Sequence, residues 1–164
     1  MTNKERALLV AERVHANATY DIYPYIYHPK MVAKIAEDLG YDESIVIACL
    51  LHDTTEDGGL SYNKIKKYFG LEVAEIVYAV TDELGRNRKE KHIKTYPKIQ
   101  ANWKATVVKI CDRIANIKHS KEFTSSKFKM YKDEHSFFVS SLINDTHPDD
   151  VNRAWNALEK VVKN

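Results

Sequence analysis

Hydrophobic residues recur at helical spacing along almost the whole chain, with polar residues between them. Val73, Ile76 and Val77, for example, share one face of a helix, because residues three and four apart lie side by side. Only five glycines and four prolines interrupt the chain, and no stretch alternates polar and apolar residues as a strand does. The pattern predicts an all-α fold, a compact bundle of about seven to nine helices.

Capping residues, glycines and prolines predict where these helices begin and end. Thr2 and Glu5 form a capping box, which predicts a first helix over residues 3–19. Residues 20–27 are aromatic and include Pro24, so we expect a loop or an extended surface arm there. Residues 84–94 are polar and basic, which predicts a connection or a short helix. Further helices are expected over 29–40, 43–52, 61–70, 73–80, 103–118 and 125–143, and from Thr146-x-Pro148 onward.

An apolar run at 45–51 leads directly into His52, Asp53, Glu56 and Asp57. The run belongs in the core and carries His52 and Asp53 inward with it. A buried charge costs several kcal/mol or more unless it is paired or binds a metal. We therefore expect a divalent metal at this position, with further ligands far away in the sequence.

Length and composition set broad limits. A chain of 164 residues with 44% hydrophobic and 29% charged residues is typical of a single globular domain over 1–164. The net charge of +2 does not indicate nucleic-acid binding, and no stretch approaches the roughly 20 apolar residues of a membrane span. The N-terminus lacks the apolar segment of a signal peptide, so we expect a cytoplasmic protein with no membrane partner. Cys49 and Cys111 are expected to be small core residues.

Four residues form a candidate metal set: His28, His52, Asp53 and Asp112. Two imidazoles and two carboxylates suit Mn²⁺, Fe²⁺, Co²⁺ or Zn²⁺ and leave positions for water and substrate oxygens. The alternative is structural: His28 could cap a helix, and Asp112 could pair with Arg113. Taken singly, each structural reading is at least as good as the metal reading, and only the adjacent His52 and Asp53 shift the balance toward a metal.

Three blocks of the sequence resemble the HD-domain phosphohydrolases. They are Tyr-Ile-Tyr-His-Pro at 25–29, Leu-His-Asp-Thr-Thr-Glu-Asp at 51–57 and Lys-Ile-Cys-Asp-Arg-Ile-Ala-Asn at 109–116. Their order and the Glu-Asp extension are most similar to the (p)ppGpp hydrolase branch, meaning the Rel/SpoT-type hydrolase domains and the small alarmone hydrolases. The resemblance covers residues 11–130. It implies that the four candidate residues hold a metal, usually Mn²⁺, and that Glu56 and Asp57 position or activate the attacking water.

The same resemblance suggests how a nucleotide is held. Lys109, Asp112 and Asn116 share a helix face, and the family places this asparagine against the nucleotide. Lys109 could meet a phosphate, and Arg113 could bind substrate or form a structural ion pair. In the basic stretch 86–94, Arg88 is the strongest candidate for attracting a polyanion. Tyr131 could stack on a base or pack in the core.

These observations predict metal-dependent hydrolysis of a small phosphorylated nucleotide. The favoured reaction is removal of the 3′-pyrophosphate of (p)ppGpp to leave GDP or GTP. Rel/SpoT-type domains usually carry an Arg-Lys pair before the Tyr-Ile-x-His-Pro block, whereas residues 16–24 contain no basic residue. Another nucleotide or nucleotide cofactor, such as NADPH, is therefore the alternative substrate. A non-catalytic nucleotide-binding regulator is a third reading, against which the acidic pair Glu56 and Asp57 argues. The chain ends soon after its last predicted helix, so a stand-alone hydrolase of open oligomeric state is expected.

Overall fold

The computed structural model describes every residue from 1 to 164 except the side chain of Asp57. Within this described part, nine helices of eight residues or more and one five-residue helix account for most of the chain. The predicted all-α fold is therefore confirmed. In chain order the helices are α1 (Asn3–Val14), α2 (Tyr27–Asp38), α3 (Glu43–Leu51), α4 (Thr54–Gly58), α5 (Tyr62–Phe69), α6 (Leu71–Val80), α7 (Arg88–Gln100), α8 (Trp103–Phe123), α9 (Ser125–Leu142) and α10 (Val151–Lys163).

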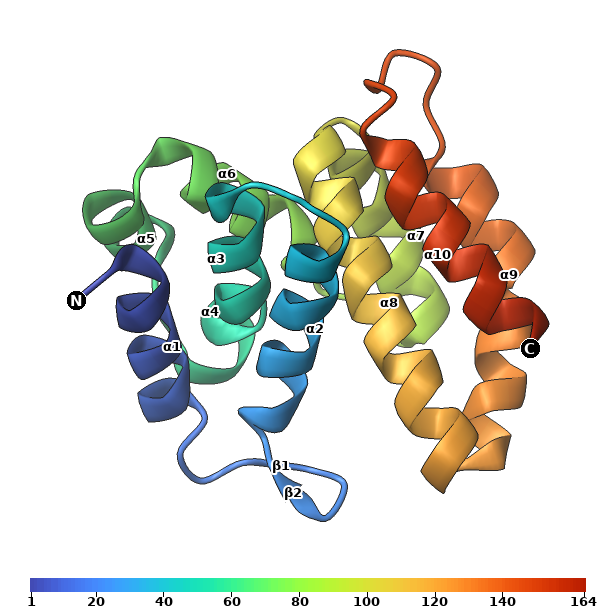
Figure 1. The fold of residues 1–164 in the computed structure, drawn as a ribbon, viewed down its shortest axis with the longest axis horizontal. Helices are drawn as coiled ribbons and strands as arrows, with labels where there is room; N and C mark the ends of the chain where they lie inside the picture. Colours follow the sequence, from blue (N-terminus) through green and yellow to red (C-terminus); the bar gives the residue numbers. More distant parts are fainter.

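Helix α8 lies at the centre of the bundle and packs against α2, α3, α6, α7, α9 and α10 (Figure 1). Its residues from Ala105 to Ala115 are buried except for Lys109. Helix α3 is buried from Ile45 to Leu51, as its continuous apolar run predicts. A helix that is apolar all round needs neighbours on every side, and α3 finds them in α1, α2, α6 and α8. This burial carries the residues after Leu51 into the interior.

Side-chain caps set three of the helix starts that the sequence predicts. Both bonds of the Thr2–Glu5 capping box are present at α1. At α3 the Asp42 carboxylate accepts the backbone N–H of Ile45 at 3.1 Å, and at α5 the Ser61 hydroxyl accepts that of Lys64 at 3.2 Å. These bonds satisfy donors that have no partner within the helix, which explains why the boundaries are readable locally.

The prediction of a first helix to residue 19 and of no strand was wrong. Helix α1 ends at Val14, and residues 19–24 form a small antiparallel hairpin of β1 (Thr19–Tyr20) and β2 (Tyr23–Pro24). The backbone N–H of Tyr25 donates to the carbonyl of Ala18 at 3.0 Å, and Asp21 takes a φ of 57° in the turn. The hairpin packs aromatic rings against neighbouring helices. This stabilising tertiary contact cannot be read from the helical spacing of residues 15–19.

Several other boundaries differ from the prediction. Helix α2 begins at Tyr27, so Pro29 lies in its first turn, where no backbone donor is needed. Residues 88–100 form the full helix α7, because Asn87 caps it and the internal Pro97 is tolerated. Helix α8 continues to Phe123. The last helix begins at Val151, after a turn at 145–147 and Pro148. Among the described residues, no helix is both long and apolar enough to cross a membrane.

Candidate metal centre and its cavity

Three helices bring the four candidate metal ligands together. His28 is the second residue of α2, His52 and Asp53 directly follow α3, and Asp112 lies in the middle of α8. His28 and His52 are 3% and 5% exposed, and Asp112 is 9% exposed. Because α2 and α3 both pack on α8, residues separated by up to 84 positions meet at one point.

The donor atoms of these side chains lie within a few ångströms of one another. His28 Nε2 is 2.7 Å from Asp112 Oδ1, and His52 Nε2 is 3.4 Å from the same oxygen. His52 Nε2 also lies 3.1 Å from Asp53 Oδ2. One donor atom from each of His28, His52 and Asp53 fits within a span of 4.8 Å. The structure therefore brings together all four residues of the predicted set.

The hydrogen bonds around His52 leave one of its nitrogens suited to a cation. His52 Nδ1–H donates to the carbonyl of Cys49 at 2.7 Å, and a carbonyl can only accept. In the neutral form that binds a metal, Nε2 then carries a lone pair, whereas without a metal the nearby carboxylates favour the protonated form. This buried Nε2 makes no hydrogen bond within the described part of the chain. A bound cation would satisfy it, and a backbone carbonyl that orients the other ring nitrogen is a common feature of histidine metal ligands. The donor set thus fits a divalent metal.

Charge balance in the cluster keeps both carboxylates ionised. Burial raises the pKa of Asp53, but the charge of His52 and its contact outweigh this and lower that pKa to about 2. The pKa of Asp112 lies well below its usual value, because Lys109, His28 and His52 together outweigh burial. The two carboxylates in turn raise the pKa of His52. Ionised oxygens are the ligand state that a divalent cation needs.

Tyr20 in the β-hairpin and Tyr25 directly after it contact the cluster, a role that the sequence did not predict. The Tyr25 hydroxyl donates to Asp53 Oδ2. The Tyr20 ring stacks on the His28 imidazole, with centroids 4.6 Å apart and 13° between the planes. Its hydroxyl donates to Asn116 Oδ1 at 2.6 Å, and Asn116 Nδ2 donates to Asp112 Oδ1 at 3.3 Å. Tyr25 lies inside the block at 25–29, which could have indicated its role, whereas no local signal distinguishes Tyr20.

Glu56 lies beside the cluster in α4 and lines a small cavity with His52, Asp53 and Asp112. Its carboxylate accepts the backbone N–H of Asp82. Burial of the carboxyl group, and then repulsion by Asp53 and Asp82, raise the pKa of Glu56 to about 7. The side chain of Asp57 lies outside the described residues. The predicted roles of both residues stay predictions.

A cavity of about 270 Å³ opens over the cluster. His28, Asp53 and Asp112 contribute to its wall. All five candidate substrate residues also line it, namely Arg88, Lys109, Arg113, Asn116 and Tyr131. Asp82, His92 and the two tyrosines Tyr20 and Tyr25 complete the wall. His92 is 7% exposed and stacks on Tyr96 at this wall.

The cations of this cavity differ in how firmly they are held. Glu134 accepts from Arg113 Nη1 at 2.8 Å and from Arg88 Nε at 2.7 Å. These bonds outweigh burial and lower the pKa of Glu134 to about 2. Both guanidinium groups lie over the Tyr131 ring, at 4.9 Å for Arg113 and 5.8 Å for Arg88. Lys109 Nζ lies 3.4 Å from Asp112 Oδ2. Arg113 forms its structural ion pair with Glu134 rather than with Asp112. The Arg113 side chain still borders the cavity.

The model of the HD-domain family matches residues 7–136, so this chain belongs to the HD-domain family. The resemblance seen in the sequence blocks is therefore confirmed at the level of the family. Membership implies dependence on a divalent metal, in accord with the cluster of His28, His52 and Asp53.

Several relatives with named activities are similar to this chain in sequence. The guanosine-3′,5′-bis(diphosphate) 3′-pyrophosphohydrolase of Aquifex aeolicus is 37% identical over 111 residues, which are 65% of this chain and 16% of that protein. The MESH1 enzyme of Xenopus tropicalis, which has the same activity in its name, is 36% identical over 104 residues, or 62% of this chain and 58% of MESH1. The chain thus spans less than two thirds of these relatives.

Solved structures share the fold over a longer range. A metazoan ortholog of SpoT, described as hydrolysing ppGpp, superposes with a TM-score of 0.75 at 22% identity. The match covers 98% of this chain and 96% of that one. A protein from Listeria monocytogenes superposes with a TM-score of 0.66 at 24% identity, over 85% of this chain and 98% of that one. These likenesses establish the helical HD-domain fold.

Proposed function

We propose that this protein is a metal-dependent phosphohydrolase that removes the 3′-pyrophosphate of (p)ppGpp. The observation that carries the proposal is the meeting of two features in one cavity. A cluster of two imidazoles and two carboxylates lies next to Lys109, Arg88 and Arg113. Cations beside a metal centre suit a polyanionic phosphate substrate. The names of the relatives, which are 36–37% identical, support the choice of (p)ppGpp.

In this proposal His28, His52, Asp53 and Asp112 hold the metal, with Mn²⁺ as the favoured ion and Fe²⁺, Co²⁺ or Zn²⁺ as alternatives. When bound, such a metal lowers the pKa of water and offsets negative charge on a phosphate. The other side chains then fix the ligands. The Cys49 carbonyl orients the His52 ring through its Nδ1–H, and the Tyr25 hydroxyl holds Asp53. These bonds preorganise the site before the substrate arrives.

Glu56 is the proposed acceptor of the proton from the attacking water. A carboxyl group with a pKa near 7 can take up and release a proton at neutral pH. The water oxygen bonds to the phosphorus next to the ribose 3′ oxygen, and the bond between these two atoms of the substrate breaks. Pyrophosphate leaves, and the 3′ oxygen takes up a proton. The products are GDP from ppGpp and GTP from pppGpp. Asp57 is proposed to assist in orienting the water.

The remaining wall residues are proposed to hold the nucleotide. Lys109 and Arg88 contact phosphate oxygens, because their charges border the cavity. Asn116 contacts the nucleoside, and the ring of Tyr131 offers a face for stacking. Arg113 is buried and donates to both Glu134 and Tyr96, so its contribution is mainly to the charge of the cavity.

A substrate panel tests the proposal directly. The purified protein is loaded with Mn²⁺ and incubated with ppGpp, pppGpp, NADPH and nucleoside mono-, di- and triphosphates. We expect stoichiometric release of pyrophosphate from ppGpp, with GDP as the other product. Phosphate release from NADPH without turnover of ppGpp would show that the proposed substrate is wrong, whereas the proposed metal site would stand. Nucleotide binding without turnover of any compound would favour a regulator instead.

A further inference from the structure

A second and larger cavity lies on the opposite side of α2 from the metal cluster. It has a volume of about 610 Å³ and runs between α1 and α2, over part of α3. Ile26, directly before α2, and Lys30 and Ala33 on α2 line it, at a spacing that places them on one helix face. His28 points the other way, toward α8. Cavities of roughly 300–1,000 Å³ with mainly apolar walls are typical of small-molecule sites.

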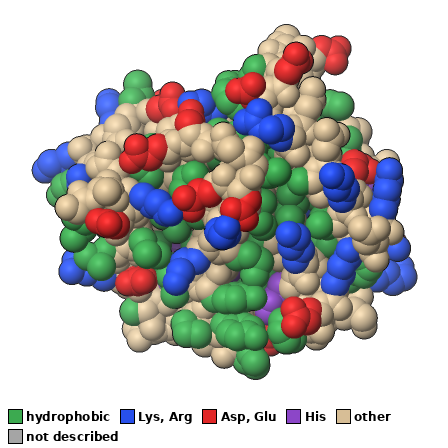
Figure 2. Space-filling model, in the orientation of Figure 1, with side chains coloured by type: hydrophobic (Ala, Val, Ile, Leu, Met, Phe, Trp, Pro, Cys, Tyr) green, Lys and Arg blue, Asp and Glu red, His purple; other side chains and the backbone are tan. Residues whose placement is uncertain are grey.

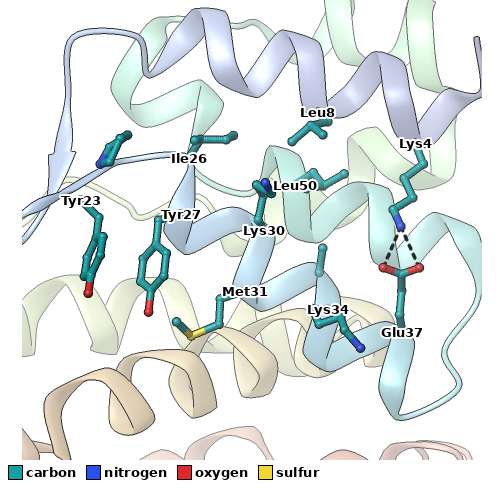
Figure 3. Close-up of a pocket in the computed structure, with 12 residues that line it drawn as sticks. Lys4, Leu8, Tyr23, Ile26, Tyr27, Lys30, Met31, Lys34, Glu37 and Leu50 are labelled. Carbon is teal, nitrogen blue, oxygen red and sulfur yellow. Dashed lines mark hydrogen bonds and ion pairs between the residues drawn. The ribbon is translucent and has the colours of Figure 1, made fainter. Parts of the chain in front are cut away.

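The walls of this open groove are mainly apolar, with a tyrosine pair at one end and an ion pair at the other (Figure 3). Leu50 forms part of its floor and is 2% exposed. Tyr23 and Tyr27 stack at one end, with centroids 4.4 Å apart. At the other end Lys4 Nζ pairs with Glu37 at 2.8 Å. The other apolar wall residues are Leu8, Pro24, Ile26, Met31 and Ala33.

The charge at the groove is positive. Three lysines and one glutamate contribute to its lining. Lys4 is neutralised by Glu37, and Lys34 pairs with Asp38 at 2.5 Å. Lys30 has no ion-pair or hydrogen-bond partner for its ammonium among the described residues, and it lines the groove from an exposed position on α2 (Figure 3). Figure 2 shows one face of the molecule, on which hydrophobic side chains lie among both basic and acidic ones.

We propose that this groove binds an anionic amphiphile, a molecule with one unbranched hydrocarbon chain and a carboxylate or phosphate head. The hydrocarbon lies against Leu8, Ile26 and Leu50, where burial removes apolar surface from water. The head group meets the ammonium of Lys30, whose own methylene chain extends the apolar wall. An extended peptide suits the groove poorly, because its backbone donors and acceptors would find few partners on apolar walls.

Titration calorimetry with dodecanoate, below its micelle concentration and on the metal-loaded protein, tests this assignment. We expect one molecule bound per chain. Lys30→Glu should weaken binding about tenfold or more, because a charge-assisted contact is replaced by repulsion. Lys160→Glu on α10 makes the same charge change far from the groove and should leave binding unchanged. Met31→Trp should abolish binding by filling the groove. Circular dichroism and melting curves check that each variant is folded.

A comparison of ligands in the titration distinguishes the contribution of the anionic head group from that of the hydrocarbon chain. Dodecyl phosphate should bind and dodecanol should bind at least about tenfold more weakly. Absence of dodecanoate binding, or binding that Lys30→Glu and Met31→Trp both leave intact, would overturn the assignment. Equal affinity for dodecanol would overturn the anionic part. Flotation with phosphatidylglycerol vesicles in the absence of dodecanoate binding would identify a membrane surface instead. A dimer that Met31→Trp dissociates, again without dodecanoate binding, would identify a second copy of the chain.

Discussion

The two sides of helix α2 differ in what they contact. Its inner side carries His28, which is 3% exposed and contacts Asp112. Its outer side carries the partly exposed Ile26 and Met31 along the groove. Surface helices usually bury their apolar side and expose the polar one. Apart from His28, α2 follows this rule, because Val32, Ala33 and Ala36 are buried and Lys30 and Lys34 are exposed. The buried imidazole is therefore the departure that needs polar partners.

The inner and outer sides differ in how firmly their residues are held. Around His28 the side chains of Tyr20, Asn116 and Asp112 form a continuous chain of contacts. On the outer side, packing dominates and the Lys30 ammonium has no partner among the described residues. A preorganised polar site suits chemistry, and an apolar groove suits binding. Variants of the inner side should therefore affect turnover most, and the following predictions test that contrast from the largest effect to the smallest.

Asp112→Asn should produce the largest loss. It keeps the shape of the side chain but removes the charge that contacts both His28 and His52. We expect turnover to fall about a thousandfold or more, with loss of bound metal, as measured by a pyrophosphate-release assay and by elemental analysis. Asp133→Asn, on the exposed side of α9, is the matched control. Retention of metal and activity by Asp112→Asn would contradict the assignment of Asp112 as a ligand of the metal site.

Glu56→Gln should lower kcat about a hundredfold while metal content stays unchanged. A proton acceptor must be ionised, so with a pKa of about 7 the rate should rise with pH up to neutrality and then level off. A bound cation shifts this rising limb to lower pH. The variant should lack the limb, as a pH–rate profile would reveal, and Glu12→Gln on α1 is the control. An unchanged kcat would assign the proton acceptor to another group.

Metal should stabilise the inner site. At a Mn²⁺ concentration a hundredfold above its Kd, linkage gives about 2.7 kcal/mol, which corresponds to a rise in Tm of about 5–10 °C for a domain of this size. Melting curves with and without Mn²⁺ after chelation measure it. His28→Ala should lose the rise, whereas His135→Ala, outside the cluster, should keep it. Equal shifts in both variants would mean that Mn²⁺ acts elsewhere.

His92 should make the fold sensitive to acid. Burial, and then repulsion by Arg88 and Lys109, lower its pKa to about 4, against about 6.5 in an unfolded chain. Between these values the unfolded state binds the extra proton, so stability falls as the pH drops from 6.5 to 4, by at most about 3 kcal/mol. Urea unfolding across this range should show a smaller fall for His92→Gln than for the natural protein. Parallel curves would contradict the burial of a neutral imidazole.

Arg88→Ala should have the smallest effect. Arg88 is exposed at the rim of the cavity, and Glu134 keeps Arg113 as a partner when Arg88 is lost. We expect KM to rise about three- to tenfold with kcat within about twofold, because rim charges contribute about 1 kcal/mol. Arg86→Ala, two residues away and highly exposed, is the control in steady-state kinetics. A large fall in kcat would move Arg88 into the reacting centre.

Local signals in the sequence predicted much of the fold. The caps at Thr2, Asp42 and Ser61 bond within their own turn, so they are readable without knowledge of the rest of the chain. The start of α10 has no side-chain cap, and its prediction was wrong. The hairpin was missed for a related reason. Its two-residue strands are too short for a pattern, and its stability comes from rings packed against His28 and His119.

The sequence by itself determined the helical class, the buried run at 45–51 and the ligand types that follow it, because periodicity, caps and the cost of burying charge are local properties. Only the tertiary structure decided that His28, His52, Asp53 and Asp112 meet, since their approach depends on how α2 and α3 pack on α8. It also decided which side of α2 is polar. The neighbours Tyr27 and His28 face an apolar groove and a charged cluster, respectively, because the helix turns about 100° between them.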